Sequence, residues 1–370
     1  MILKTDKIKN ICNYVLPAID NSGISKITNT LELYCENNVL NLCITNNEYY
    51  VKALLTINQT EEFHATVNAS LFLNLMSKVT SETVELIVDT SSLNVFANGE
   101  YKIPLIFDED CLLTLTEIDV NNVTVDFNTT SDVLKSIDAY NTKELQKGVI
   151  SNPVQRLYYV DEKGAITFTS GACVNNFSLS TPVKLLLNQK LVKLFKLFTD
   201  EEVNVKLGHE SYMGDTVTKV KFSTDNVIIS AILTNDDAML SSIPVDIIRE
   251  RALDPYPYTI CLSKKQLLDC IDRLMLFKDD SLKVYSKFEF NNDLVKIYSM
   301  SNLNFETNTY LSKTLPNDFN SYECMIDLND IKLSLTSFNS ESINIKFGNS
   351  KCVVVYSDSV FDVIPEIIEA

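Results

Sequence analysis

The sequence predicts an α+β chain of three similar domains in which antiparallel sheet predominates. Two observations carry this prediction: one helix, turn and strand pattern occurs three times, and short hairpin signals join the strands between its copies. The chain has 370 residues, of which 45% are hydrophobic and 9% aromatic, so it can bury several cores. We expect the domains to cover residues 1–118, 119–250 and 251–370.

The repeated pattern starts at residues 80, 199 and 339, so its copies lie 119 (199 − 80) and 140 (339 − 199) residues apart. In each copy a polar turn with an acidic residue leads into alternating apolar and polar residues, which is typical of a half-buried strand. Apolar residues also stand one, four and eight positions before each copy, which places them on one face of a helix. These residues are Val79, Met76 and Phe72, then Phe198, Phe195 and Leu191, then Phe338, Leu335 and Ile331. A period this long indicates similar domains rather than small stacked repeats.

The first domain begins with an amphipathic helix for which Thr5 or Asp6 is the expected N-cap and Pro17 the stop. Next, Asn37-Asn38 separates two alternating segments. Asparagine tolerates positive φ, so this pair predicts a tight hairpin. A further strand, the helix of the first repeat copy and more strands complete the domain.

The second domain follows the same order of elements. A strand at 123–127 and a helix ending near Ile137 lead to a hairpin at 157–168, and a long helix is expected from about 183 to 198. We expect a link to the third domain, rich in proline and charge, from about 236 to 257.

The third domain begins with a strand at 258, after which Ser263 and Gln266 form a capping box for the next helix. Residues 291–293 predict a hairpin like that of the first domain, and 327–338 a second helix. Each domain thus contains two units of one helix plus antiparallel strands.

Charge and cysteine content limit the classes of function. The 32 Lys and Arg residues against 49 Asp and Glu give a net charge of −17, which argues against a general nucleic-acid coat. The 9 cysteines are scattered without a CxxC pair, which favours buried thiols in a reducing compartment over disulfides or metal sites. No apolar run approaches the roughly 20 residues of a membrane span, and no signal-peptide core is present. We therefore expect a cytoplasmic protein.

Residues for catalysis are scarce. The two histidines, His64 and His209, stand in strand and turn contexts without a neighbouring nucleophile. The 8 glycines form neither GxGxxG nor GxxxxGK[ST], so no phosphate-binding loop is predicted. The acids at 108–110 and 236–237 lack metal-site spacing. We predict no catalytic residue, cofactor or metal; a β-rich hydrolase using scattered acids is the alternative that metal-dependent turnover would revive.

Lysines gather on the predicted helices. Lys190, Lys193 and Lys196 follow one another by three, and others lie on the first helices of the domains. A solvated helix face is one interpretation. In an acidic chain, cations on equivalent helices favour a basic surface that contacts phosphates without reading bases. The predicted DNA-facing set is Lys4, Lys7, Lys9, Lys78, Lys135, Lys190, Lys193, Lys196, Lys264, Lys265, Arg156 and Tyr158.

The chain as a whole resembles the bacterial sliding clamp, the β subunit of DNA polymerase III. Besides domain order, four short matches carry the resemblance: Arg156 to Tyr159 with the family's Arg-Tyr-Tyr, 168–171 with Ala-Thr-Asp-Gly, Ile243-Pro244 with Phe-Pro, and 363–365 with Val-Met-Pro. The chain departs from the family at 172–174, which replaces His-Arg-Leu, and at Glu366-Ile367, which replaces Met-Arg. These departures indicate a divergent member, for instance a phage-encoded one, in bacterial or host cytoplasm.

The resemblance implies a non-enzymatic processivity factor for DNA replication. Two chains would form a head-to-tail ring with helices around a central hole. Duplex DNA would pass through it after loading by an ATP-driven clamp loader, and the ring would tether the polymerase and other clamp-binding proteins. The alternative is an interaction scaffold that has the clamp fold and does not encircle DNA.

The resemblance also implies two protein-binding sites. A cleft for a partner peptide, between the second and third domains, would use Tyr159, Thr169, Gly171, Ala172, Cys173, Val174, Pro244, Ile248, Val363, Ile364 and Pro365, with Leu157 in reserve. Ordinary interdomain core is the alternative for each. Asp327 and Asp330 fall where the family often has Asn and Tyr. The dimer interface would join Leu276 and Phe277 to Leu105, Ile106 and Phe107.

Overall fold

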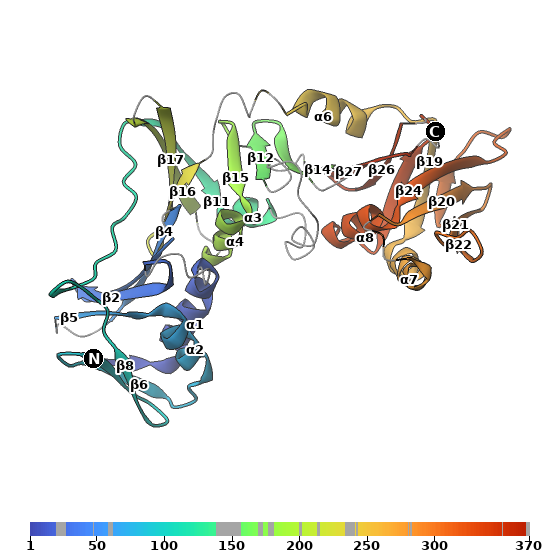
Figure 1. The fold of residues 1–370 in the computed structure, drawn as a ribbon. Coiled ribbons are helices and arrows are strands. Elements are labelled where there is room, and N and C mark those ends of the chain that lie inside the picture. Colours follow the sequence, from blue (N-terminus) through green and yellow to red (C-terminus); the bar gives the residue numbers. More distant parts are fainter. Residues whose placement is uncertain are drawn as a thin grey trace. The chain divides into compact units, whose positions relative to one another are not determined.

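The computed structural model describes residues 1–19, 27–46, 48–57, 62–137, 157–168, 173–176, 181–199, 202–212, 215–233, 241, 243–279, 281, 283–349 and 351–367. By their contacts these residues divide into two compact units. Figure 1 labels their helices and strands and colours them by residue number. The first unit comprises Met1–Lys135 and Lys190–Asn235. The second comprises Ser136–Gln189 and Asp236–Ala370.

The first unit contains antiparallel sheets joined by short turns. Its large sheet has the order β11-β16-β17-β18-β4-β3-β2-β5, a smaller one has the order β1-β6-β7-β8, and β9 pairs with β10. The strands are β1 (Ile2–Lys4), β2 (Thr30–Glu36), β3 (Val39–Thr45), β4 (Tyr49–Thr56), β5 (Phe63–Asn68), β6 (Thr83–Val88), β7 (Ser92–Phe96), β8 (Glu100–Pro104), β9 (Phe107–Asp108), β10 (Cys111–Leu112), β11 (Val123–Thr130), β16 (Glu202–Tyr212), β17 (Asp215–Ser223) and β18 (Val227–Leu233).

Short helices cover the apolar sheet faces of this unit. They are α1 (Thr5–Val15), α2 (Ala69–Lys78), α3 (Ser131–Ser136) and α4 (Gln189–Leu194), with 3-10 turns η1 (Leu16–Ala18), η2 (Ile27–Asn29) and η4 (Phe195–Leu197). Helices α1 and α2 contact each other, as Figure 1 shows. The apolar faces predicted for the first two repeat copies are buried. Phe72, Leu191, Phe195 and Phe198 are fully inaccessible, and Met76 is 1% exposed.

The predicted asparagine hairpin is confirmed. Asn37 and Asn38 have φ of 51° and 61°, and they join β2 to β3 where Glu36 pairs with Val39. Two successive positive φ values give the turn twist that matches a right-handed pair of strands.

Residues 113–122 form an extended strap, without strand pairing, that crosses the large sheet. Three strap residues bond to three different strands: Leu115 N donates to Glu32 Oε2 of β2 (2.9 Å), Glu117 pairs with Lys221 of β17 (2.6 Å), and Asn121 Nδ2 donates to Glu210 Oε1 of β16 (3.1 Å). The strap therefore holds strands that are distant in sequence.

The second unit contains a nine-stranded and a four-stranded antiparallel sheet. Their orders are β15-β12-β13-β14-β27-β26-β25-β19-β23 and β22-β21-β20-β24. The strands are β12 (Leu157–Asp161), β13 (Gly164–Phe168), β14 (Cys173–Asn176), β15 (Leu185–Asn188), β19 (Tyr258–Ser263), β20 (Tyr285–Phe290), β21 (Leu294–Tyr298), β22 (Phe305–Thr309), β23 (Ser312–Thr314), β24 (Tyr322–Asp327), β25 (Ser342–Phe347), β26 (Cys352–Ser357) and β27 (Val360–Pro365).

The helices of the second unit are α6 (Val245–Leu253), α7 (Lys264–Leu274), η5 (Met275–Phe277) and α8 (Leu328–Ser337). Helices α7 and α8 contact each other. The predicted cap of α7 is confirmed, since the Ser263 hydroxyl accepts from the Gln266 amide. The third repeat copy is also buried as predicted, with Ile331, Leu335 and Phe338 at most 2% exposed.

The third repeat reproduces a specific backbone contact of the first. Thr5 N donates to Glu82 O at 3.1 Å, and Lys264 N donates to Glu341 O at 2.9 Å. The donor residue and the acceptor residue of the second bond each lie 259 residues after those of the first (264 − 5 and 341 − 82). The start of each first helix is therefore tied to the strand after the second helix in the same way.

The large sheets combine strands from different predicted domains. In the first unit, β18 pairs with β4, and in the second, β14 pairs with β27. For this reason the compact units do not coincide with the repeat, and the three domain boundaries stay predictions.

The structure corrects two predicted elements. The helix expected over 183–198 begins only at Gln189, because 185–188 forms β15 and pairs with β12, Leu187 opposite Tyr158. Sheet pairing here overrides local helix propensity. The predicted link contains an additional helix, α6, whose buried residues Val245, Arg249 and Ala252 follow a spacing of four and three.

Two local details also differ from expectation. Helix α1 begins at Thr5 with Lys4 as N-cap, whereas Thr5 or Asp6 is the predicted N-cap. The β20–β21 turn has no asparagine with positive φ, so Asn291 and Asn292 do not repeat the Asn37-Asn38 turn. Within the described residues, no helix is long and apolar enough to span a membrane.

Candidate functional site

An apolar cluster in the second unit contains some of the residues predicted for the peptide cleft. Leu157 and Tyr159 of β12 pack with Ile243 and Val245, and Ile248 of α6 packs against them. The cluster also contains Ile166 and Leu186. Strand alternation predicts that Leu157 and Tyr159 lie on one sheet face, and their packing in one cluster confirms it.

Helix α6 forms one wall of this region. It contacts β14 and β27, and its buried side carries Val245, Arg249 and Ala252. Two large apolar residues of α6 lie in solvent, Ile247 at 58% and Leu253 at 57% exposure. Pro244, a predicted cleft residue, occupies the N-cap position.

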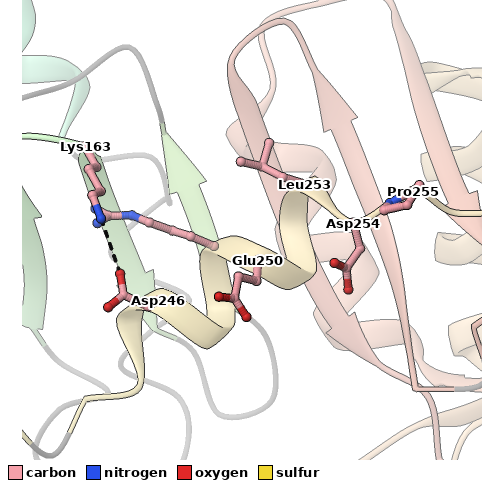
Figure 2. Close-up of a pocket in the computed structure, with 7 residues that line it drawn as sticks. Lys163, Asp246, Glu250, Leu253, Asp254 and Pro255 are labelled. Atoms are coloured by element: carbon pink, nitrogen blue, oxygen red, sulfur yellow. Dashed lines mark ion pairs between the residues drawn. The ribbon is translucent and has the colours of Figure 1, made fainter.

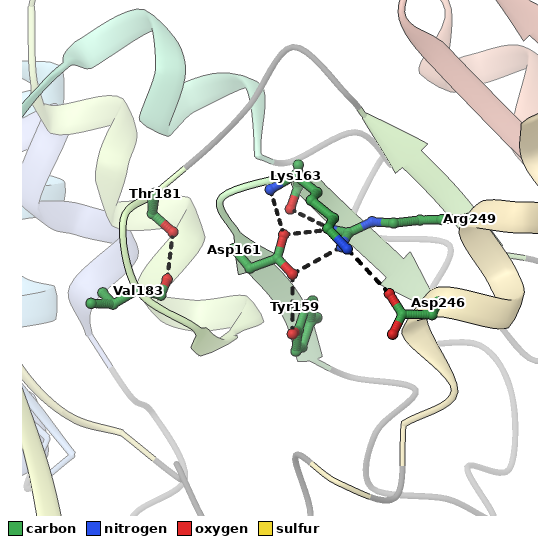
Figure 3. A network of polar contacts seen from close by, with 8 residues as sticks. Tyr159, Asp161, Lys163, Thr181, Val183, Asp246 and Arg249 are labelled. Atoms are coloured by element: carbon green, nitrogen blue, oxygen red, sulfur yellow. Dashed lines mark hydrogen bonds and ion pairs between the residues drawn. The ribbon is translucent and has the colours of Figure 1, made fainter.

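A buried ion pair joins α6 to the β12–β13 hairpin, and Figure 3 shows its surroundings. Arg249 Nη1 donates to Asp161 Oδ2 at 2.9 Å and Nη2 to Asp161 Oδ1 at 2.7 Å, so the pair is bidentate. The guanidinium also donates to Gly164 O at 3.1 Å. Asp161 additionally accepts from the Tyr159 hydroxyl at 3.2 Å and the Lys163 amide at 2.8 Å.

Asp161 is 7% and Arg249 6% exposed, so the low local dielectric strengthens the hydrogen bonds of this network. Burial raises the pKa of Asp161, but the Arg249 and Lys163 hydrogen bonds outweigh it, and the pKa lies below its usual value. Burial and the Asp161 charge raise the pKa of Tyr159 to about 12, so its hydroxyl stays a donor. Removing one partner would leave an unpaired buried charge, which costs about 3–5 kcal/mol.

Two cavities flank this network. One of about 470 Å³ lies beside the hairpin and the start of α6, lined by Tyr159, Asp161, Glu162, Lys163, Lys184, Ser241, Ile243, Pro244, Val245, Asp246 and Ile247. The other, of about 890 Å³, runs along α6 (Figure 2) and is lined by Lys163, Asp246, Arg249, Glu250, Leu253, Asp254 and Pro255. Lys163 and Asp246 line both and form an ion pair at 3.6 Å.

The remaining predicted cleft residues fall into three groups. On β27, Val363 lies opposite Cys173 and Asp362 opposite Val174, which brings the predicted C-terminal residues beside β14. Ile364 is fully buried in the apolar core of the second unit, whereas Pro365 is exposed. Thr169, Gly171 and Ala172 lie outside the described residues.

The acidic residues expected near this site form a buried group of their own. Lys283 Nζ lies 3.1 Å from Asp327 Oδ2 and 3.6 Å from Asp330 Oδ2. Asp327 caps α8 by accepting from the Asn329 amide at 3.0 Å. Burial raises the pKa of Asp330 to about 6, despite the nearby ammonium group.

The predicted DNA-facing residues differ in environment. Lys9 Nζ donates to Val79 O at 3.3 Å, and Lys264 Nζ donates to Phe338 O, so both hold the carbonyl that follows a second helix. Lys135 lies 4.0 Å from Asp132. Lys193 is half-buried, and the exposed members are Lys4, Lys7, Lys78, Lys190, Lys196 and Lys265. Tyr158 is fully buried, and Arg156 lies outside the described residues.

The predicted dimer-interface residues are more accessible. Leu276 and Phe277 of η5 are 80% and 53% exposed, and Phe107 of β9 is 43% exposed. Leu105 and Ile106 are half-buried, and their amides donate to Ser91 O and Thr66 O.

Both histidines contact a polar side chain, and most of the described cysteines are buried. His64 Nε2 lies 2.9 Å from Glu32 Oε1, and His209 Nδ1 lies 3.0 Å from Thr218 Oγ1. Cys12, Cys43, Cys270, Cys324 and Cys352 are buried, whereas Cys111 is exposed. Across the part of the chain that the structure describes, no three His, Cys, Asp or Glu residues are grouped as a metal site.

The fold is that of a bacterial sliding clamp. No protein-family model matches the sequence, and no curated protein matches it. Solved structures match over the whole chain. The sliding clamp of Pseudomonas aeruginosa bound to griselimycin aligns with a TM-score of 0.79 at 13% identity, covering 100% of this chain and 99% of that one.

The β subunit of DNA polymerase of Streptococcus pyogenes gives a TM-score of 0.78 at 15% identity, and DNA polymerase III β subunit of Thermotoga maritima gives 0.78 at 13%. Both alignments cover 100% of this chain and 99% of the other. The mixed helix and antiparallel sheet architecture predicted from the repeat is thereby confirmed as the clamp fold. At these identities the likeness concerns the fold.

Proposed function

We propose that this protein is a DNA polymerase processivity factor, a sliding clamp that encircles duplex DNA and tethers the replicative polymerase. The observation that carries the proposal is the full-length match to solved clamps at TM-scores of 0.75–0.79. A fold alone does not define a function, so the residues must supply the rest. Two surfaces of this chain support the proposal.

The first is a set of lysines on α1, α4, η4 and α7. Lys190 and Lys196 are exposed and Lys193 is half-buried on α4 and η4, and Lys7 and Lys265 are exposed on α1 and α7. Ammonium groups at this spacing suit contact with successive phosphates, independent of sequence. The acidic remainder, within a net charge of −17, repels DNA elsewhere.

The second surface is the region around α6, where Tyr159, Pro244 and Ile248 meet. An apolar cluster beside cavities of about 470 and 890 Å³ suits a short extended peptide from a polymerase or another clamp-binding protein. Val363 and Pro365 on β27 would extend this site. The protein itself would be non-enzymatic, without a cofactor.

The proposed assembly is a cytoplasmic head-to-tail homodimer of three-domain chains, closed on DNA by an ATP-driven loader. The exposed Leu276 and Phe277 would meet Leu105, Ile106 and Phe107 of a second copy. A clamp-fold scaffold that recruits proteins without encircling DNA is the alternative, and it predicts no topological link to DNA.

The test is retention on DNA of defined topology. The chain, with the polymerase and loader of its own replication system, is bound to nicked circular plasmid and separated from free protein by gel filtration. We expect retention on the circle, loss after the plasmid is cut once, and retention when the cut ends are blocked. Equal retention on open linear DNA would contradict encirclement.

Lysine variants test the phosphate-facing surface in the same assay. Replacing Lys190, Lys193 and Lys196 with Ala should reduce polymerase stimulation several-fold, more steeply at higher salt. The matched control replaces three exposed lysines of other elements, Lys102, Lys313 and Lys351, and should leave stimulation unchanged. Equal loss in both triple variants would assign the effect to net charge.

A further inference from the structure

The ion pair between Asp161 and Arg249 is a costly way to hold α6. Both residues are more than nine-tenths buried, and taking two charges out of water is costly before any attraction is regained. Apolar residues of similar volume often stabilise such a position as well or better. Stability alone therefore does not account for the pair. Its hydrogen-bond geometry offers another explanation.

That geometry fixes orientation. Two parallel N–H···O bonds of 2.9 and 2.7 Å define the plane of the guanidinium relative to the carboxylate, and a third bond to Gly164 O adds a second attachment point on the hairpin. Asp161 is itself held by the Tyr159 hydroxyl and the Lys163 amide. Apolar contacts, in contrast, are non-directional and permit a helix to slide or rotate.

The pair connects the residues proposed to receive a partner peptide. Tyr159 hydrogen-bonds to Asp161, and its ring lies 6.0 Å from the Arg249 guanidinium carbon. Arg249 follows Ile248 directly and stands five residues after Pro244, all in or at the start of α6. A rotation of α6 would therefore move Pro244 and Ile248 relative to Tyr159. Figure 3 shows Arg249 reaching from α6 to the end of the hairpin.

We propose that the Asp161–Arg249 pair is the positioning element of the partner-peptide site: it sets the position of α6 against the β12–β13 hairpin and thereby the shape of that site. This inference rests on the proposed function for the peptide, but the placing of α6 is testable without it. Asp161 and Arg249 act through Tyr159, Pro244 and Ile248, and they are positioning residues.

The experiment compares a broken pair with an apolar replacement. Arg249→Met leaves Asp161 buried and unpaired, whereas Asp161→Leu with Arg249→Met removes both charges. Three quantities are measured on the full chain: the urea midpoint of unfolding, hydrogen exchange of the α6 amides, and affinity for a fluorescein-labelled hexapeptide with two leucines and one phenylalanine. The probe is apolar because Tyr159, Ile243 and Val245 line the smaller cavity.

For the single variant we expect a lower urea midpoint, α6 exchange at least tenfold faster and probe binding at least tenfold weaker. The double variant is the decisive one. It should regain the wild-type midpoint while α6 exchange stays fast and probe binding stays at least tenfold weaker. A double variant with wild-type exchange and affinity would overturn the inference, because the pair would then only stabilise the fold.

The matched control is the ion pair Glu117–Lys221 of the first unit, which has a 2.6 Å contact and 25% and 29% side-chain exposure. Glu117→Leu with Lys221→Met should leave α6 exchange and probe affinity unchanged. A wild-type chain that does not bind the probe would count against the proposed peptide site. In that case fast α6 exchange in the double variant still supports the positioning role, and wild-type exchange overturns it.

Discussion

At the start of α8, the carboxylates of Asp327 and Asp330 share the single ammonium group of Lys283. Asp327 also accepts backbone hydrogen bonds from Val284 and Asn329. Asp330 is 5% exposed, and its carboxylate lies 3.6 Å from the same ammonium group. Asp327 thus caps the helix, and Asp330 is the buried acid whose pKa is raised.

This arrangement predicts a pH dependence of stability in the acidic range. Burial raises the folded pKa of Asp330 to about 6, above its unfolded value of about 3.9. The folded state then binds more protons between these values, so stability falls as pH rises from about 4 to 6. Urea unfolding of the wild type should show a loss on the order of 1–3 kcal/mol across this range, and Asp330→Asn should remove most of it.

Other groups do not obscure this measurement. The pKa of Asp161 is lowered, so its contribution is present above about pH 4 and is lost only below it. The pKa of Glu366 is raised by burial, although the Tyr322 hydroxyl opposes this, but Glu366 is common to both proteins and cancels in their difference. Parallel pH profiles for wild type and Asp330→Asn would show that Asp330 ionises normally.

Residue-scale prediction from sequence succeeded where one residue determines its own backbone. Asn37 and Asn38 tolerate positive φ, and Ser263 caps the helix that follows it. The pairing of Asp161 with Arg249 was missed because its partners lie 88 residues apart. A signal was present: Val245, Ile248 and Ala252 are spaced as on a helix, which places Arg249 beside its apolar face.

At the scale of elements, the strap of residues 113–122 depends on the absence of a side chain beneath it. A Cβ built on Gly208 of β16 would lie 2.0 Å from Asn121 O and 3.0 Å from Val120 Cγ1. The nearest atom is backbone and cannot rotate away. Gly208 is therefore required by close approach of the strap.

We expect Gly208→Ala to displace the strap and to lower the unfolding free energy by about 1–3 kcal/mol, the usual cost of overpacking. Differential scanning calorimetry and urea unfolding measure the loss, and faster hydrogen exchange at Leu115 N would locate it, because that amide bonds to Glu32. Gly99→Ala is the control, since its Cβ would meet only Tyr101 at 3.5 Å or more. Equal stability of the two variants would mean that the strap moves freely.

Sequence patterns predicted elements best where local and tertiary preferences agree. The helices of all three repeat copies bury the predicted faces because their apolar spacing serves both. Over 183–198 they conflict: consecutive leucines at 185–187 fit either a helix or a buried strand, and pairing with β12 decides for the strand. The strap alternates apolar and polar residues at 113–116 and 118–121, as a strand would, yet it pairs with no strand, so its local pattern could not indicate a strap.

At the scale of the whole molecule, the exposed apolar residues indicate where a second copy would bind. Leu276 is 80% exposed and follows α7 in a turn, and no fold requirement explains a leucine and a phenylalanine side by side in solvent there. Phe107 stands in a short exposed hairpin of the first unit. A contact between two different surfaces of one chain gives a ring when the rotation closes, and an open filament when it does not.

Closure at two subunits predicts a single species of twice 41.8 kDa by light-scattering chromatography over a range of concentrations. Leu276→Asp with Phe277→Asp should convert it to monomer, because burying two carboxylates in an apolar contact costs more than the contact returns. Ile87→Asp, a change at a 42% exposed position of β6, is the control and should keep the wild-type mass. A mass that grows with concentration would mean an open assembly. An unchanged dimer in the double variant would place the interface elsewhere and leave Leu276 and Phe277 for another partner.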